Sequence, residues 1–180
     1  MEVQTNQFIT PPSNERAASA ILNLLRITAL ANERTRISLQ DIMLVTQTSQ
    51  DDALETLALL YCGGLLKVSP MFWDETEQNP FLSPRRTFAA SLDHLVSLFS
   101  GEDWRNDYVG MRLDIAYKGD GDYTLAGWRG QDNDMERDGY IESRASDAYD
   151  TQVSRITPRG RAIYLVLGLL FPEPAVSEAA

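Results

Sequence analysis

Apolar residues near the start of the chain recur three or four positions apart, which is the spacing of one helix face. The first such set follows a polar, proline-containing lead-in and predicts a helix over roughly residues 14–33. Its apolar positions are Ala18, Ile21, Leu22, Leu25 and Ala29. We therefore expect this helix to bury one face against the rest of the fold.

Two helix-start signals follow in quick succession. Ser38 is a favourable N-cap, and Asp41 stands three residues later, where it can complete a capping box. Ser49 repeats the signal and begins a longer apolar-faced helix, which Gly63-Gly64 ends. The sequence therefore predicts two helices joined by a tight turn.

A mixed segment comes after these glycines. Residues 65–69 predict a short strand, a polar loop follows, and residues 81–84 predict a returning strand. Apolar residues then recur at helical spacing, which predicts a fourth helix over residues 85–100. These positions are Phe88, Leu92, Leu95 and Phe99.

The pattern changes from period three or four to period two in the next segment. Met111, Leu113, Ile115 and Tyr117 alternate with polar residues, and a second alternating run begins at Tyr123. Glycine and aspartate residues separate the two runs, as in a tight turn. The pattern therefore predicts a β-hairpin over residues 111–127.

The order of helix, helix-turn-helix, strand, polar loop, strand and helix over residues 14–100 resembles a winged helix-turn-helix domain. In that family the strand after the motif begins with a Gly-Leu-Ile-type step, which Gly64-Leu65-Leu66 matches. The returning wing strand ends in a Leu/Ile-Thr-Pro-x-Gly step, which Leu82-Ser83-Pro84 matches without the glycine. The resemblance implies a motif helix suited to the major groove of DNA and wing residues suited to its backbone.

The second half of the chain repeats the closing part of this pattern. Residues 139–143, a polar loop and the step Ile156-Thr157-Pro158-Arg159-Gly160 resemble the wing and the entry to the closing helix of the same family. This repetition suggests an internal duplication. Two interpretations remain open. The chain is a tandem winged helix whose second copy is degenerate or carries the β-hairpin, or it is one winged helix with an α+β insertion.

These patterns define the expected organisation, an α+β and mostly helical fold. A flexible lead-in covers residues 1–13, and a winged-helix domain covers residues 14–100. A second winged-helix-like α+β unit with an acidic β-hairpin region covers residues 101–171, and a loose tail covers residues 172–180.

Composition and charge exclude several classes of protein. The formal net charge of the 180-residue chain is −10, which excludes a polybasic nucleic-acid binder of the histone kind. The start of the chain lacks the pattern of a signal peptide, and its apolar runs are too short for a membrane-spanning helix. We therefore expect a cytoplasmic protein.

The residues with reactive or metal-binding side chains are sparse. His94 is the only histidine, and Cys62 is the only cysteine, with apolar neighbours that favour a buried packing role. Acids alternate from Asp134 as in a calcium loop, but Ala145 stands at the twelfth place, where the bidentate glutamate belongs. We expect no enzyme activity, no metal site and no cofactor.

The sequence of the expected recognition helix argues against direct recognition of DNA bases. Residues 50–61 contain three acids and no base, and carboxylates near phosphates are repelled. A DNA-binding regulator would then rely on backbone contacts from arginines in the loops and wings. These candidates are Arg34, Arg36, Arg85, Arg86, Arg155, Arg159 and Arg161.

A protein partner is the preferred hypothesis. The chain is similar in charge and expected architecture to the kleisin-binding subunits of chromosome-organising complexes, which implies an adaptor or regulator in a DNA-related process. Met71, Phe72 and Trp73 in the first wing are the candidate contacts. Two alternatives accompany it: an acidic DNA mimic that inhibits a nucleic-acid-binding protein, and a homodimer formed through the first or last helix.

Overall fold

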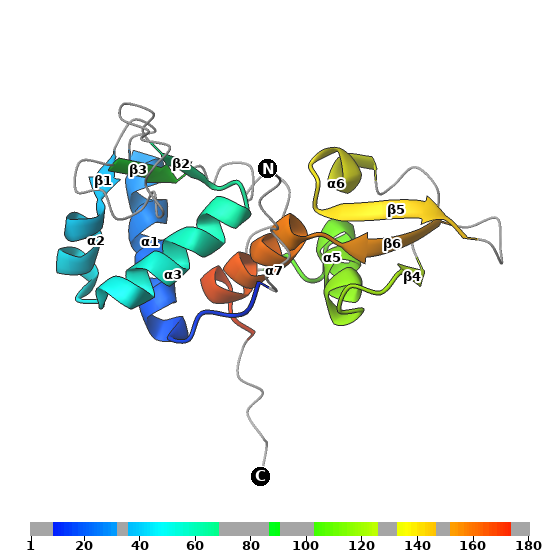
Figure 1. The fold of residues 1–180 in the computed structure, drawn as a ribbon, viewed down its shortest axis with the longest axis horizontal. Coiled ribbons are helices and arrows are strands. Elements are labelled where there is room, and N and C mark those ends of the chain that lie inside the picture. The colour runs from blue at the N-terminus through cyan, green and yellow to red at the C-terminus, as the bar shows by residue number, and fades with distance from the viewer. Residues whose placement is uncertain are drawn as a thin grey trace, which may run out of the picture.

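The computed structural model describes residues 9–31, 36–68, 87–90, 103–125, 133–146 and 152–173. These residues form an α+β fold that is mostly helical, with two three-stranded antiparallel sheets (Figure 1). The first sheet and its helices make up one unit, and the second sheet and its helices make up another. We call them the first unit and the second unit.

The first unit contains three helices and one sheet. Its elements are α1 (Glu15–Ala31), β1 (Ile37–Ser38), α2 (Leu39–Thr46), α3 (Gln50–Cys62), β2 (Leu66–Val68) and β3 (Thr87–Ala90). Strand β3 lies in the middle of the sheet, between β1 and β2. The helix α1 packs on α2, α3 and β3, so the three helices cover the sheet.

The helix starts follow the sequence signals. The Ser38 hydroxyl accepts from the backbone N–H of Asp41, and the Asp41 carboxylate accepts from the backbone N–H of Ser38, which completes the capping box. The Ser49 hydroxyl accepts from the backbone N–H of Asp52 in the same way. The predicted helix pair and the strand after Gly63-Gly64 are therefore confirmed.

The predicted fourth helix over residues 85–100 is wrong at its start. Residues Thr87–Ala90 form β3, whose Phe88 pairs with Ile37 on one side and Val68 on the other. The sequence pattern places Phe88 in a helix because the apolar residues after it recur at helical spacing. The physical reason for the difference is that a middle strand gains ladder hydrogen bonds on both edges, which outweighs local periodicity.

The second unit has a similar order of elements. These are α5 (Tyr108–Lys118), β4 (Thr124–Leu125), α6 (Asn133–Arg137), β5 (Ile141–Ala145), β6 (Gln152–Ile156) and α7 (Pro158–Leu170). The middle strand is again the last of the three, since β6 lies between β4 and β5. Helix α5 packs on β6 as α1 packs on β3.

The predicted β-hairpin over residues 111–127 is also wrong. Most of its first arm lies in helix α5, which Asp107 caps by accepting from the backbone N–H of Tyr108. Leu113 is buried, whereas Met111 and Ile115 remain 46% and 43% exposed. The alternating pattern predicted a strand incorrectly because two of its four apolar residues point to solvent and do not form one buried strand face.

The two units share the geometry that joins helix to strand. In each, a glycine with positive φ stands two residues after the helix, Gly64 at 71° and Gly139 at 75°. One residue further, the backbone N–H reaches back five positions, from Leu65 to Leu60 and from Tyr140 to Met135, at 2.9 and 2.8 Å. The same helix-ending turn therefore begins β2 and β5.

The strand registers also correspond. Leu66 and Ile141, which follow these turns, pair with Ala90 and Ile156 respectively. Two residues earlier in the middle strands, Phe88 pairs with Ile37 of β1, and Ser154 pairs with Thr124 of β4. Strand order, register and turn geometry thus agree between the two halves, as an internal duplication of the chain would produce.

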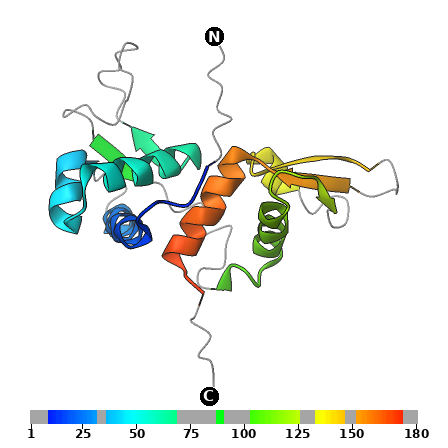
Figure 2. The same ribbon diagram turned by 60° about the horizontal axis from the view of Figure 1, so that its bottom comes forward.

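Helix α7 lies between the two units (Figure 2). It packs on α1 and α3 of the first unit and on α5 of the second. Its Ala162, Ile163, Val166 and Leu167 are fully buried, which agrees with a buried last helix instead of a dimer-forming one. The two units therefore share one hydrophobic core.

We predict that Gly160→Ala destabilises the fold. A Cβ at Gly160 in α7 would lie 2.0 Å from the carbonyl oxygen of Tyr140, so backbone would have to move. The expected loss in the free energy of unfolding is about 1–3 kcal/mol or more, measured by urea denaturation.

Gly168→Ala on the same helix is the matched control. Its Cβ would meet Arg105 Nη2 at 3.6 Å, an ordinary contact, so this variant should be unchanged or gain up to about 1 kcal/mol. Equal stability of the two variants would contradict a close helix–strand approach at Gly160.

Candidate functional site

The first turn of α3 is acidic. Asp51, Asp52 and Glu55 lie on the first two turns, and the helix contains no basic residue. The Asp52 carboxylate accepts from the Ser49 hydroxyl at 2.6 Å, which fixes its position at the helix start. Acids here interact favourably with the helix dipole, and they give this end of the helix a negative surface.

The chain ahead of α1 is held against this acidic turn. The backbone N–H and the hydroxyl of Ser13 donate to the two carboxylate oxygens of Glu55 at 3.0 and 3.1 Å. The Asn14 amide donates to Asp52 at 3.5 Å, and Pro12 is buried. The lead-in expected to be flexible over residues 1–13 therefore has fixed contacts at its end. All these donors are neutral, so they do not balance the negative charge of the carboxylates.

A cleft of about 240 Å³ opens between α1 and the turn that joins α2 to α3. Ala17 and Ala20 of α1 form its apolar part, and hydroxyl, amide and charged groups surround them. Its polar lining residues are Asn14, Arg16, Thr46, Gln47, Thr48, Ser49 and Asp52. The cleft adjoins the acidic turn through Asp52.

Four exposed apolar side chains lie on the two neighbouring helices α1 and α2. Ile27 and Leu30 of α1 are 64% and 67% exposed, and Leu44 and Val45 of α2 are 78% and 62% exposed. We call these four residues the apolar face. The sequence analysis did not predict that these residues are exposed. The available signal was the pair of apolar residues Leu44 and Val45 close to buried Ile42.

The predicted contact residues are placed as follows. Met71, Phe72 and Trp73 lie outside the described residues, as do Arg34, Arg85 and Arg86. Arg36 is exposed directly before β1. The structure therefore describes four of the seven candidate arginines and none of the three wing residues.

The three described arginines of the second unit each contact a neighbouring side chain. Arg155 makes an ion pair with Glu142 at 2.7 Å, and Arg161 makes one with Asp120 at 2.6 Å. Arg159 lies over the ring of Tyr140, with its guanidinium carbon 5.3 Å from the ring centre. Arg155 and Arg161 thus have an acidic partner within the chain, which weakens the hypothesis of one continuous basic track.

Cys62 is exposed, so the prediction of a buried packing role is wrong. It stands at the last position of α3, where the helix ends and its neighbours turn away into the strand. Partial burial nevertheless raises the pKa of its thiol by desolvation. A raised pKa keeps the group protonated and weakly nucleophilic at neutral pH.

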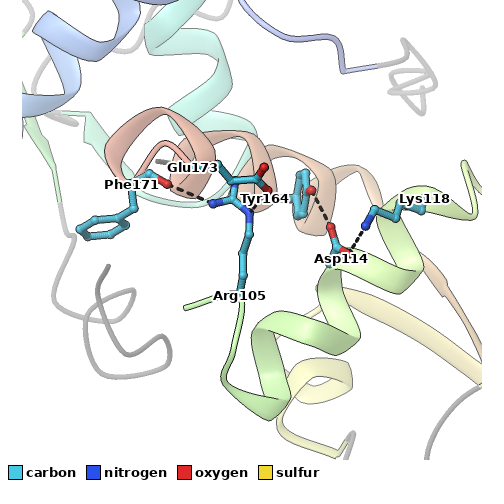
Figure 3. Close-up of polar contacts among 6 residues, drawn as sticks. All are labelled: Arg105, Asp114, Lys118, Tyr164, Phe171 and Glu173. Atoms are coloured by element: carbon cyan, nitrogen blue, oxygen red, sulfur yellow. Dashed lines mark hydrogen bonds and ion pairs between the residues drawn. The ribbon is translucent and has the colours of Figure 1, made fainter. Parts of the chain in front are cut away.

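A polar network joins α5 to α7 beside the shared core (Figure 3). The Tyr164 hydroxyl donates to Asp114 at 2.7 Å, and Asp114 also pairs with Lys118 at 2.6 Å. The Tyr164 ring stacks on Tyr117 at 3.9 Å. Burial first, and then the hydrogen bond and charge of Asp114, raise the pKa of Tyr164 to about 12.

Arg105 fixes the end of α7 from the same side (Figure 3). It donates to the carbonyl oxygen of Phe171 at 3.1 Å and pairs with Glu173 at 3.1 Å. Its guanidinium also stacks on Trp104, at 4.4 Å from the ring centre. A cation at a helix C-terminus is favourable, so this cluster positions α7.

Other kinds of site find no support within the described ranges. No group of three or more His, Cys, Asp or Glu side chains that could hold a metal ion occurs in them. The residues compared above with a calcium loop form α6 and β5. No helix in the part of the chain that the structure describes is long and apolar enough to cross a membrane.

Comparisons with known proteins add no relative. Neither a protein-family model, nor a curated protein, nor a solved structure matches this chain.

We predict that Tyr164→Phe changes the alkaline stability of the protein. Because the pKa of Tyr164 is raised from 10.0 to about 12 on folding, the neutral phenol stabilises the fold fully below pH 10. That stabilisation is lost as the pH rises toward 12. The Tyr164→Phe variant should not show this alkaline loss of stability. At neutral pH its free energy of unfolding should be lower by about 1 kcal/mol, because the hydrogen bond to Asp114 is missing.

Urea unfolding of both proteins from neutral pH to about pH 12 tests this, since their difference isolates Tyr164 from the other groups that titrate. An identical decline of both proteins in alkali would show that folding does not raise the pKa of Tyr164.

Proposed function

We propose that this protein is a non-catalytic tandem winged-helix adaptor or regulator in a DNA-related process, and that its first unit binds a basic partner protein. The apolar face carries the proposal. Four large apolar side chains at 62–78% exposure on adjoining helices are costly to leave in water and are typical of a contact surface.

The element order supports the winged-helix assignment. The first unit runs helix, strand, two helices and a two-stranded return, with the returning strand in the middle of the sheet. The second unit repeats the strand order and the register, with α6 as the described helix before its return. A tandem arrangement accounts for both units with one supersecondary pattern.

The charge of α3 favours a protein partner over DNA. The helix that would read bases carries Asp51, Asp52 and Glu55 and no base, and its first turn is already in contact with Ser13 and Asn14. A phosphate backbone would be repelled there. A lysine- or arginine-rich protein segment would be attracted.

The chemistry of the partner follows from these two neighbouring surfaces. The apolar face needs apolar side chains, and the acidic turn needs cations, so a basic amphipathic segment fits both. The cleft beside Asp52 is lined by Ala17 and Ala20, which can pack against an apolar side chain, while Asp52 and Arg16 place one charge of each sign in its lining.

We predict that Leu44→Glu abolishes partner binding. Leu44 is 78% exposed, so the substitution should change the free energy of unfolding by no more than about 0.5 kcal/mol. The protein is immobilised and proteins retained from its host extract are quantified by mass spectrometry. We expect a basic protein whose recovery falls at least about tenfold, which corresponds to 1.4 kcal/mol of binding.

Met111→Glu is the matched control, because Met111 is an exposed apolar residue of the second unit at 46% exposure. It should retain the same partner as the unsubstituted protein. A partner retained equally by both variants would contradict binding through the apolar face.

A further inference from the structure

Side chains from all three strands of the second sheet meet on its outer face. Tyr123 directly precedes β4, Arg155 lies on β6 and Arg144 lies on β5. The guanidinium carbons of Arg144 and Arg155 stand 4.1 and 5.1 Å from the centre of the Tyr123 ring. Figure 1 shows these strands at the end of the molecule away from the first unit.

The register explains why these side chains share one face. Glu142 pairs with Arg155, and Arg144 follows Glu142 by two positions, so both point to the same side of β5. The opposite side carries Ser143 and Ser154, whose hydroxyls meet at 2.9 Å beneath the sheet, with Ser154 fully buried. Arg144, Arg155 and Tyr123 are therefore on the solvent side.

Two arginines and one carboxylate lie at this place on the sheet. Arg144 and Arg155 both lie over the Tyr123 ring, and the Glu142 carboxylate pairs with Arg155. The Glu142 carboxylate accepts a hydrogen bond from Nε of Arg155 and forms an ion pair with its Nη2. Arg144 is exposed and makes no ion pair with any residue that the structure describes. No described residue accepts a hydrogen bond from its N–H donors, so within the described residues they are available to a ligand.

We propose that this outer face binds a single nucleic-acid strand. A guanidinium carries paired N–H donors that match a phosphate group. The Tyr123 ring and the guanidiniums that lie over it also offer planar groups against which a base can pack. A carboxylate-rich peptide would use the donors but not the platform, so a strand fits better.

This site is independent of the apolar face, because the apolar face belongs to α1 and α2 of the first unit and Tyr123, Arg144 and Arg155 belong to the second. Leu44→Glu should therefore bind the strand as the unsubstituted protein does. Failure of one proposal leaves the other unaffected.

Fluorescence anisotropy with a labelled thymidine 12-mer at low salt tests the proposal. We expect Arg144→Gln to weaken binding about fivefold to tenfold and to reduce the salt slope of log K by about 0.7, as loss of one phosphate contact does for single strands. Arg137→Gln is the control, because Arg137 is an exposed arginine of the same unit, paired with Asp134.

Each outcome decides the proposal. Loss of affinity in Arg144→Gln alone, with unchanged thermal unfolding, supports it. No binding of the 12-mer, or an equal loss in Arg137→Gln, overturns it. Two competitors test for other ligands. Displacement of the 12-mer by pyrophosphate at equal phosphate concentration indicates that the site binds free phosphate, and displacement by a glutamate 12-mer indicates that it binds an acidic peptide. Either result overturns the proposal of a nucleic-acid strand.

Discussion

The burial of α7 between the two units determines how the rest of the molecule is arranged. The helix is apolar on nearly every side, so it needs neighbours on several sides, and α1, α3 and α5 supply them. Its start depends on Gly160, where a side chain would collide with the backbone at Tyr140. Its end depends on Arg105, which holds the last carbonyl groups. Both units are thus fixed by one helix that belongs in sequence to the second.

This arrangement separates opposite charges. The contacts of the acidic turn of α3, Ser13 and Asn14, are neutral donors, so they do not balance its negative charge. On the second sheet, the ring beside Arg144 is also neutral and does not balance the charge of the guanidinium. Coulomb attraction alone would draw counter-charges to each surface, and the chain has enough acids and bases to supply them. Unbalanced charges on two distant surfaces are what two different partners would require.

Local signals in the sequence were sufficient for the elements that local interactions form. The caps at Ser38 and Ser49 and the glycines after α3 act within a few residues, and those predictions are confirmed. The strand β3 and the helix α5 were missed because their identity depends on distant partners: β3 on both neighbouring strands, α5 on α7. The apolar face could not be predicted for a similar reason. Leu44 is exposed because no distant segment packs against it, and the local sequence does not show this.

The two units agree in some features and differ in others. The turns at Gly64 and Gly139 and the strand registers agree between the units. The segment between the paired strands is twelve residues longer in the first unit, 69–86 against 146–151, and includes Met71, Phe72 and Trp73. Turn geometry and register must persist because a slip of one residue would turn every core side chain of a strand outward. Outer faces and connecting loops are under no such constraint. The two units can therefore share a framework and still differ in their surfaces, with the carboxylates of Asp51, Asp52 and Glu55 on one and the guanidinium of Arg144 on the other.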